Sequence, residues 1–359
     1  MKLIFDCRFL KIEHHDGISR FSSELFSAVA RKTDVTALIC NQEQLKWLPE
    51  GTKFLEANYP TDATKELFVS RTLNRAGATH VFSPMQTMGS LGRKYKLILT
   101  LHDLIYYKYP KAPNTLPIMI RIAWRLYHLN FWVARILLNR ADAVATVSNT
   151  SRELIIANRL TNKPVYVVYN APDPRTTFPT NSPETSPSLR KTLVYMGSFM
   201  EYKNVETLAA SMERLPEFQL ILLSAISDKA RTSLLEVARG AANRLVFKNG
   251  VSDEQYSEIL NSAFALVSAS KDEGFGIPLV EAMTHSVPLV LSDIQIFHEI
   301  AGEAALFFDP SNPDDFASRV KELSEPETWN RLSKDSGARG KFFNWDNSAQ
   351  KLLEALETL

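Results

Sequence analysis

Two glutamates bracket a glycine-rich turn in the segment KDEGFGIPLVEAM, which runs from Lys271 to Met283. Glu273 precedes the turn and Glu281 follows it, and between them Pro278 stands at the first helical position, which proline favours. A glycine turn that leads into a helix presents unpaired backbone N–H groups at the positive end of the helix dipole, and both favour a phosphate. Carboxylates instead accept hydrogen bonds from sugar hydroxyls. The segment therefore predicts a diphosphate site with a sugar on one side and a ribose on the other.

Elements that would position this segment alternate along the whole chain. Short apolar runs rich in β-branched residues predict strands at 2–5, 35–40, 80–83, 96–101, 143–148, 165–169, 192–197, 220–225, 245–249, 265–270 and 288–292. Helical periodicity predicts helices at 18–32, 65–76, 149–160, 205–215, 228–241 and 252–263. Continuous apolar strands that alternate with helices are typical of parallel sheets covered on both faces. The fold class expected is therefore α/β with doubly wound sheets.

The alternation breaks once, in the stretch APDPRTTFPTNSPETSPSLRK at 171–191. Its prolines and small polar residues exclude a helix or a central strand and predict an exposed linker. We expect a first domain at 1–170, completed by a C-terminal helix at 346–359, and a second domain at 171–345. Ligands of such sheets bind at the carboxyl ends of the strands, so a site shared across a cleft is expected.

Composition excludes several other classes of protein. The 359 residues carry 41 Lys and Arg against 40 Asp and Glu, so no net field favours a nucleic acid partner. The two cysteines, Cys7 and Cys40, have no metal-ligand spacing, which favours a reducing compartment and a cytoplasmic location. The apolar run at the start of the chain is too short for a signal peptide. The chain contains no run of 18 apolar residues, so no membrane span is predicted. No G-x-G-x-x-G follows a strand and no P-loop motif occurs, which disfavours dinucleotide enzymes and P-loop NTPases.

The chain resembles retaining glycosyltransferases of family 4, which have the GT-B fold of two Rossmann-like domains. EGFGIPLVEAM looks like the E-x7-E signature of that family, and the resemblance covers nearly the whole chain. The other similar segments, in chain order, are DGISRFSSEL, LTLHDLIYYKYP, ADAVATVSNTSRELI, VYVVYNAPD, YMGSFMEYKNVETL, VSDEQYSEILNSAFALVSAS, SDIQIFHEIAGEAALFFDPSNPDDFA and FFNWDNSAQKLLEAL. Their order and spacing carry the resemblance more than any single motif does.

The resemblance implies a role for each matching residue. Glu273 would contact donor-sugar hydroxyls, Glu281 the ribose, Lys203 the diphosphate, and His102 the surroundings of the reacting carbon. The donor-binding residues implied are Gly17, Arg20, Ser198, Gly274, Phe275, Gly276, Ile277, Pro278, Leu279 and Glu281. Relatives usually have an arginine just after the glycine of GSFMEYKN or just before its lysine, where this chain has Ser198 and Tyr202.

Some of these residues also have simpler interpretations. His102 with Asp103 could stabilise a loop, Lys203 could be a surface charge, and Asn170 could cap a strand. His14 and His15 in the first loop could have no role in the site. The pair Asp314–Asp315 fits a helix start better than a metal site.

The stretch from 117 to 140 has a long helical pattern in which Arg121, Arg125 and His128 share one face and Trp124 adds aromatic bulk. Basic-aromatic helices of this kind can lie on anionic membranes. The alternative is a domain helix whose apolar face packs inward and whose arginines face solvent. A peripheral contact with the inner face of a membrane through 117–140 is therefore one expectation among two.

The function implied is transfer of a hexosyl unit, mannosyl first, from a nucleoside diphosphate sugar to a glycan or lipid-linked acceptor hydroxyl. The donor implied is GDP-mannose or UDP-glucose, with retention of configuration and with no metal and no further cofactor, since the chain has no D-x-D. In the family the departing phosphate oxygen is often proposed to help deprotonate the acceptor. The alternatives are a non-catalytic GT-B subunit or binding protein whose site has decayed, and a sugar-nucleotide epimerase.

Overall fold

The computed structural model describes residues 1–359 except 14–15, 58, 60, 62–63, 113–116 and 175–189. His14, His15 and most of the expected linker therefore lie outside the described residues. The chain divides into two compact units, unit 1 with residues 1–170 and 344–359, and unit 2 with residues 171–343. The expected domain ends at 170 and 345 lie beside these boundaries.

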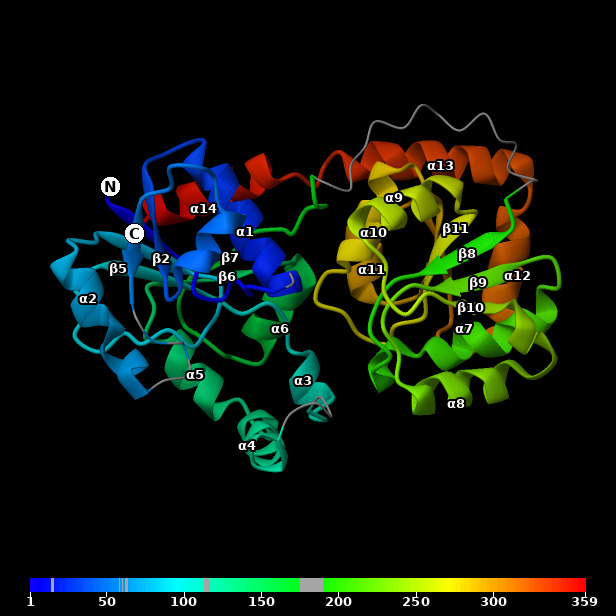
Figure 1. The fold of residues 1–359 in the computed structure, drawn as a ribbon, viewed down its shortest axis with the longest axis horizontal. Helices are drawn as coiled ribbons and strands as arrows, with labels where there is room; N and C mark the ends of the chain where they lie inside the picture. The colour runs from blue at the N-terminus through cyan, green and yellow to red at the C-terminus, as the bar shows by residue number, and fades with distance from the viewer. Residues whose placement is uncertain (14–15, 58, 60, 62–63, 113–116, 175–189) are drawn as a thin grey trace. The chain divides into compact units, whose positions relative to one another are not determined.

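Unit 1 contains, within its described residues, a sheet of seven strands that all pair in parallel (Figure 1). Across the sheet they are β3 (Phe54–Glu56), β2 (Val35–Ile39), β1 (Leu3–Asp6), β4 (His80–Ser83), β5 (Lys96–Thr100), β6 (Ala143–Thr146) and β7 (Val165–Val167). The chain moves outward from β1 to β3 and then returns to place β4 on the other side of β1. The strand order therefore reverses between β1 and β4, and doubly wound sheets bind their ligands at such a switch point.

Helices cover both faces of this sheet. They are α1 (Gly17–Ala30), α2 (Val69–Arg75), α3 (Ile105–Lys108), α4 (Ile118–His128), α5 (Trp132–Leu138), α6 (Asn149–Ala157) and α14 (Trp345–Glu357), with the 3₁₀ helices η1 (Gln42–Trp47) and η2 (Thr64–Phe68). The last helix, α14, packs on α1, and its Trp345 meets Phe21 edge to face. The C-terminal helix thus completes unit 1.

Unit 2 repeats the arrangement with six parallel strands among the residues that are described. Their order is β10 (Leu245–Phe247), β9 (Gln219–Leu222), β8 (Thr192–Tyr195), β11 (Ala265–Ser268), β12 (Leu289–Ser292) and β13 (Ala305–Phe308). Its α-helices are α7 (Val205–Ser211), α8 (Asp228–Ala238), α9 (Asp253–Ser262), α10 (Ile277–Thr284), α11 (Gln295–Ala301), α12 (Pro313–Leu323) and α13 (Pro326–Gly340). Its 3₁₀ helices are η4 (Glu201–Lys203), η5 (Met212–Arg214) and η6 (Arg239–Arg244). The switch point of this sheet lies between β8 and β11.

The structure confirms the α/β class and corrects three details of the sequence prediction. The stretch 117–140 is two helices, α4 and α5, and at the break between them the side chain of Asn130 accepts a hydrogen bond from the Trp132 backbone N–H. The strands β3 and β13 were not predicted. The other strands were predicted from apolar runs because strands such as β11 are buried along their whole length.

Candidate active site

The glycine turn joins β11 to α10 as the sequence predicts. Gly276 has φ +95°, a backbone conformation that disfavours any residue with a Cβ, and an added Cβ would press on Leu279 and Phe297. Pro278 lies in the first turn of α10, and Gly276 supplies no side chain to cap that turn. In the first turn of α10, however, Pro278 has no N–H and the Leu279 N–H donates to the Gly276 carbonyl at 2.9 Å, so an anion there would be bound by the glycine turn and Ile277 rather than by a full set of helix N–H groups.

Lys203 and Glu273 form an ion pair at the switch point of unit 2. The Lys203 Nζ lies 2.5 Å from Glu273 Oε1, and the side chains are only 16% and 11% exposed. The same carboxylate oxygen accepts a hydrogen bond of 2.9 Å from the hydroxyl of Ser270. A carboxylate and an ammonium thus stand side by side where β8 and β11 end, as a site for sugar hydroxyls and phosphate requires.

Backbone contacts fix the segment that carries Lys203. Asn204 adopts a left-handed conformation, φ +51°, which asparagine tolerates better than most residues. Its side-chain amide donates to the carbonyls of Ala269 and Pro310, and the Lys271 backbone N–H donates to the carbonyl of Tyr202. The 3₁₀ turn η4 is thereby attached to the end of β11, which holds Lys203 beside Glu273.

The loop after β8 approaches its own strand closely. The hydroxyl of Tyr195 donates to the carbonyl of Ser198 at 2.6 Å, and a Cβ on Gly197 would lie 2.8 Å from that hydroxyl. A larger residue at this position would require Tyr195 to move. Burial and the charge of Glu273 both raise the pKa of Tyr195, so this phenol stays protonated as a donor. The side chain of Ser198 points to solvent from an exposed residue and carries no positive charge.

The remaining donor-binding candidates of unit 2 follow the turn. Gly274 and Phe275 are buried, and the Phe275 ring meets Phe343 edge to face. Ile277 and Leu279 lie in the first turn of α10. Glu281 lies one turn further and is 3% exposed. The structure thus gathers the predicted turn, Lys203 and Glu273 in unit 2.

His102 belongs to unit 1 and follows β5. Its Nε2 lies 2.8 Å from the carbonyl oxygen of Pro84, and because a carbonyl only accepts, Nε2 carries the proton. Burial lowers the pKa of His102, so the ring is neutral near pH 7 and Nδ1 is its acceptor. The Phe21 ring packs edge to face against the imidazole. The neighbouring Asp103 accepts from the Ile105 backbone N–H, which starts α3.

Gly17 and Arg20 also lie in unit 1, in the first turn of α1. Asp16 caps this helix by accepting from the Ser19 backbone N–H at 2.8 Å, and Lys11 pairs with the same carboxylate. Burial raises the pKa of Asp16, but the hydrogen bonds from Lys11 and Ser19 outweigh it and hold that pKa below its usual value. A carboxylate thus already occupies the start of α1, in contrast to the start of α10.

The buried histidine makes stability depend on pH. Since the pKa of His102 is lower in the folded chain, the unfolded chain binds more protons below about pH 6.5. The free energy of unfolding should therefore fall as pH drops below that value, by up to about 1.4 kcal/mol per pH unit for one histidine. His102→Gln keeps a donor for the Pro84 carbonyl but does not titrate, so urea unfolding between pH 5 and 7.5 should show a shallower slope. An equal slope in the variant and the wild type would contradict the buried neutral state.

Two family models together match most of the chain. The model described as Glycosyltransferase Family 4 matches residues 68–176, and the model described as Glycosyl transferases group 1 matches residues 180–341. They meet where unit 1 gives way to unit 2. The chain is a family 4 glycosyltransferase with the GT-B fold. The family predicted from the E-x7-E segment is confirmed.

The curated relatives of this family 4 glycosyltransferase include proteins matched along their length. The O-antigen chain mannosyltransferase B of Escherichia coli is 25% identical, with all of both chains covered. The O-antigen chain mannosyltransferase RfbU of Salmonella typhimurium is 23% identical over 88% of this chain and 90% of the relative. Both are glycosyltransferases, which supports that activity for this chain.

Solved structures show the same fold. The sucrose-phosphate synthase from Thermosynechococcus elongatus superimposes with a TM-score of 0.75 at 17% identity, covering 99% of this chain and 98% of the other. Alr3699/HepE from Anabaena, solved in complex with UDP-glucose, gives 0.73 at 17% identity over the full length of both. These likenesses confirm the GT-B architecture of this family 4 glycosyltransferase.

Sequence reasoning missed two polar residues that build the site. Ser270 was placed in a strand and Asn204 in the turn before a helix, without a role for either. Two signals were available in the sequence. Ser270 is a small hydroxyl residue at the carboxyl end of an apolar strand, and Asn204 is an asparagine next to the candidate Lys203.

Proposed function

We propose that this family 4 glycosyltransferase transfers a mannosyl unit from GDP-mannose to an acceptor hydroxyl with retention of configuration. The observation that carries the proposal is the pairing of Lys203 with Glu273 beside the start of α10 at the switch point of unit 2. One cation, one carboxylate and the backbone of the glycine turn before α10 match the three parts of a nucleoside diphosphate sugar. The mannosyltransferase names of the full-length relatives favour mannose over glucose.

Each candidate residue has a distinct part in this proposal. The ammonium of Lys203 and the backbone of the glycine turn before α10 stabilise the negative charge that develops on the departing diphosphate. Glu273 orients the sugar through its hydroxyls, and the buried Glu281 accepts from the ribose. His102, neutral with an acceptor at Nδ1, binds a sugar hydroxyl near the reacting carbon. The departing phosphate oxygen takes the acceptor proton, so the protein contributes positioning and charge stabilisation.

Two other functions fit the fold. A non-catalytic binding protein is favoured by Ser198 and Tyr202, which stand where relatives have an arginine. A sugar-nucleotide epimerase would use the same donor without an acceptor. UDP-glucose is the alternative donor, since a structure of Alr3699/HepE contains it.

Nucleotide release distinguishes these functions. In thermal shift we expect GDP-mannose at a hundred times its dissociation constant to stabilise the protein by about 2.7 kcal/mol over the free protein, and UDP-glucose at the same concentration to stabilise it less. We expect GDP release that depends on a glycan or lipid-linked acceptor and survives EDTA, because cationic and backbone groups take the place of a metal. Release restored only by magnesium would contradict the mechanism. Epimerised sugar formed without an acceptor would favour the epimerase. Binding of the nucleotide sugar without release of nucleotide would favour the non-catalytic binding protein.

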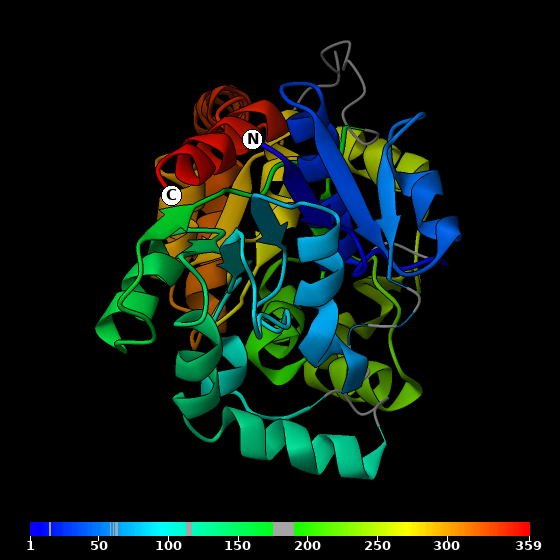
Figure 2. The same ribbon diagram turned by 90° about the vertical axis from the view of Figure 1, so that its left-hand side faces the viewer.

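We further propose that unit 1 docks on an anionic lipid surface through α4 and α5. No described helix has both the length and the apolar character needed to cross a membrane. The sequence from 104 to 141 contains no Asp or Glu, whereas its basic residues are Lys108, Lys111, Arg121, Arg125, Arg135 and Arg140. Both views show α4 at the periphery of unit 1 (Figures 1 and 2). A basic surface of this kind is attracted to anionic lipid headgroups.

The two faces of α4 differ. Trp124 and His128 pack against Tyr106 and Tyr107 of α3, and Tyr127 packs against His128. An apolar stripe faces solvent instead, and it consists of Ile118, Met119, Ile122, Leu126 and Leu129, each between 50% and 72% exposed. The aromatic side chains of α4 pack inward as the domain-helix interpretation expects, whereas this apolar stripe does not. A basic helix with an exposed apolar stripe is suited to insertion among lipid headgroups.

Vesicle binding tests this docking. The wild type should co-sediment with phosphatidylglycerol vesicles and bind phosphatidylcholine vesicles at least tenfold more weakly. Ile122→Ser with Leu126→Ser should reduce binding several-fold, because both side chains are exposed and would insert. Ile156→Ser is the matched control, since Ile156 is equally exposed at the end of α6 in the same unit. Equal losses in both variants, or no vesicle binding by the wild type, would refute the docking surface.

A further inference from the structure

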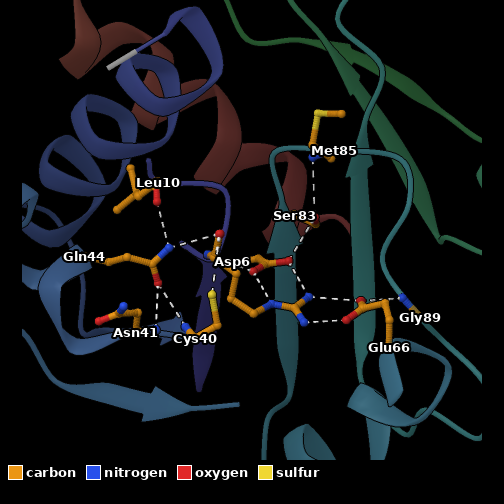
Figure 3. A network of polar contacts seen from close by, with 10 residues as sticks. Asp6, Leu10, Cys40, Asn41, Gln44, Glu66, Ser83, Met85 and Gly89 are labelled. Atoms are coloured by element: carbon orange, nitrogen blue, oxygen red, sulfur yellow. Dashed lines mark hydrogen bonds and ion pairs between the residues drawn. The ribbon is translucent and has the colours of Figure 1, made fainter. Parts of the chain in front are cut away.

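A buried network of charged residues lies at the switch point of unit 1 (Figure 3). Arg8 follows β1 and donates through Nε and Nη2 to the two carboxylate oxygens of Asp6, at 2.8 and 2.9 Å. Its Nη1 and Nη2 also reach the two oxygens of Glu66, at 2.5 and 3.0 Å. One guanidinium thus binds two carboxylates in bidentate fashion, and the three formal charges sum to minus one.

This network is too deeply buried to be explained by surface electrostatics. The side chains of Arg8 and Asp6 are 0% exposed, and that of Glu66 is 9% exposed. Buried ion pairs contribute little net stability compared with apolar residues of similar volume, because the charges lose their hydration. Doubly wound sheets bind ligands at the switch point, so a positioning role is the more specific explanation for three charges there.

The two carboxylates fix both ends of the segment 83–89. The hydroxyl of Ser83, at the end of β4, donates to Asp6 Oδ2 at 3.3 Å. The Gly89 backbone N–H donates to Glu66 Oε1 at 3.0 Å. A Cβ on Gly89 would clash with the backbone carbonyl of Glu66, so only glycine allows this approach. Figure 3 shows these contacts on either side of the guanidinium.

The segment fixed in this way holds His102. Its Pro84 carbonyl accepts from His102 Nε2 at 2.8 Å, and the preceding Ser83 carbonyl accepts from the hydroxyl of Thr100 at 2.8 Å. The hydrogen bond to Pro84 determines which ring nitrogen carries the proton. A continuous set of contacts therefore leads from Arg8 through the carboxylates and the segment 83–89 to the imidazole.

We propose that Asp6, Arg8 and Glu66 are positioning residues for the transfer reaction, which keep His102 in its Nε2–H tautomer by holding the Pro84 carbonyl in place. The proposal rests on the role that the proposed function gives to His102. In this proposal Asp6, Arg8 and Glu66 do not contact the substrate. They act through the orientation of the His102 ring. Loss of the network should therefore lower kcat more than it raises KM for the donor.

The test combines kinetics with the NMR signals of the imidazole nitrogens. Glu66→Gln keeps the shape of the side chain but removes the charge that binds Arg8, and Ser83→Ala removes the contact with Asp6 at little risk to folding. We expect each variant to lower kcat at least tenfold, with KM for the donor changed less than threefold. We also expect long-range ¹H–¹⁵N spectra to show Nε2–H alone for His102 in the wild type and a mixture of tautomers in the variants.

Asp142→Asn is the matched control for Glu66→Gln. Asp142 accepts from Arg93 Nη1 at 2.7 Å and from the Leu97 backbone N–H at 2.8 Å, so it joins an arginine and a backbone amide as Glu66 does. Asp142 precedes β6, at the amino end of that strand, whereas His102 follows the carboxyl end of β5. The control should leave kcat and the His102 signals unchanged, whatever it does to the melting temperature.

Three outcomes would count against these ideas in different ways. Wild-type kcat and tautomer in both variants would refute the positioning role. A loss of kcat with unchanged His102 signals would refute the route through this ring. A shifted tautomer together with full activity of His102→Gln would leave the link from the network to the ring standing and would refute the role of His102 in the proposed function. If Glu66→Gln fails to fold, kcat and the His102 NMR signals of Ser83→Ala test the proposal in the same way.

Discussion

Glu273→Gln should reduce kcat by at least about a thousandfold, or about 4 kcal/mol of transition-state stabilisation, while GDP binding changes less than threefold. The carboxylate oxygen Oε1 lies 2.5 Å from Lys203 Nζ and 2.9 Å from the hydroxyl of Ser270, and both are donors. An amide must turn either its oxygen or its NH₂ group toward them, and its neutral oxygen is a weaker acceptor for the ammonium and for a sugar hydroxyl. The measurement is steady-state release of GDP alongside titration calorimetry with GDP.

Glu217→Gln is the control for this substitution. Glu217 forms an ion pair of 2.6 Å with Lys191 in the same unit, but both side chains are exposed to solvent. Such exposed pairs contribute little to stability, and Glu217 precedes β9, at the amino end of that strand, whereas the glycine turn follows the carboxyl end of β11. Its loss should leave kcat unchanged. If Glu273→Gln keeps more than a tenth of the wild-type rate, Glu273 does not bind the transferred sugar.

The parts of the fold that the sequence predicts are those with strong local signals. Strands such as β8 and β11 are buried on both faces and appear as uninterrupted apolar runs. The edge strand β3 has three residues, of which Phe54 is exposed, and so short a strand has no periodicity to detect. At the break between α4 and α5 the Trp132 N–H donates to the side chain of Asn130, a contact that a helical pattern does not reveal.

The same limit applies to the candidate site. Glu273 and Lys203 were found separately, each by its own segment, but 70 residues separate them and their pairing depends on β8 and β11 being neighbours in the sheet. The network around Arg8 was not predicted at all. Asp6 and Arg8 flank a cysteine directly after a strand, and nothing local shows that their partner is Glu66, 58 residues away from Arg8. Contacts between strands that are not consecutive are what sequence patterns leave out.

Lys203→Ala should lower the rate of transfer at least about a hundredfold, or about 2.7 kcal/mol. The resemblance to family 4 implies an arginine at one of the positions that Ser198 and Tyr202 occupy in this chain, so Lys203 is the cation that the proposal assigns to the diphosphate in unit 2. Asn204 and the backbone of Tyr202 attach its segment to the end of β11, so the ammonium reaches the site at low entropic cost. Lys191→Ala, in the exposed pair with Glu217, is the control and should keep the wild-type rate. A nearly silent Lys203→Ala, in a protein that binds no nucleotide sugar, would favour the non-catalytic alternative.

A restored charge separates the two ways in which Lys203 could act. Lys203 either supplies charge beside the diphosphate or only holds Glu273 in place, and Lys203→Ala removes both effects. Ser198 is exposed and uses only its carbonyl in the contact with Tyr195, so Ser198→Arg adds a cation after β8 without disturbing that contact. In the Lys203→Ala background we expect Ser198→Arg to recover at least tenfold in rate and Ser198→Gln to recover none. Equal rates for the arginine and glutamine variants would mean that Lys203 acts by positioning Glu273, and that the charge of the leaving group is stabilised by the backbone of α10 instead.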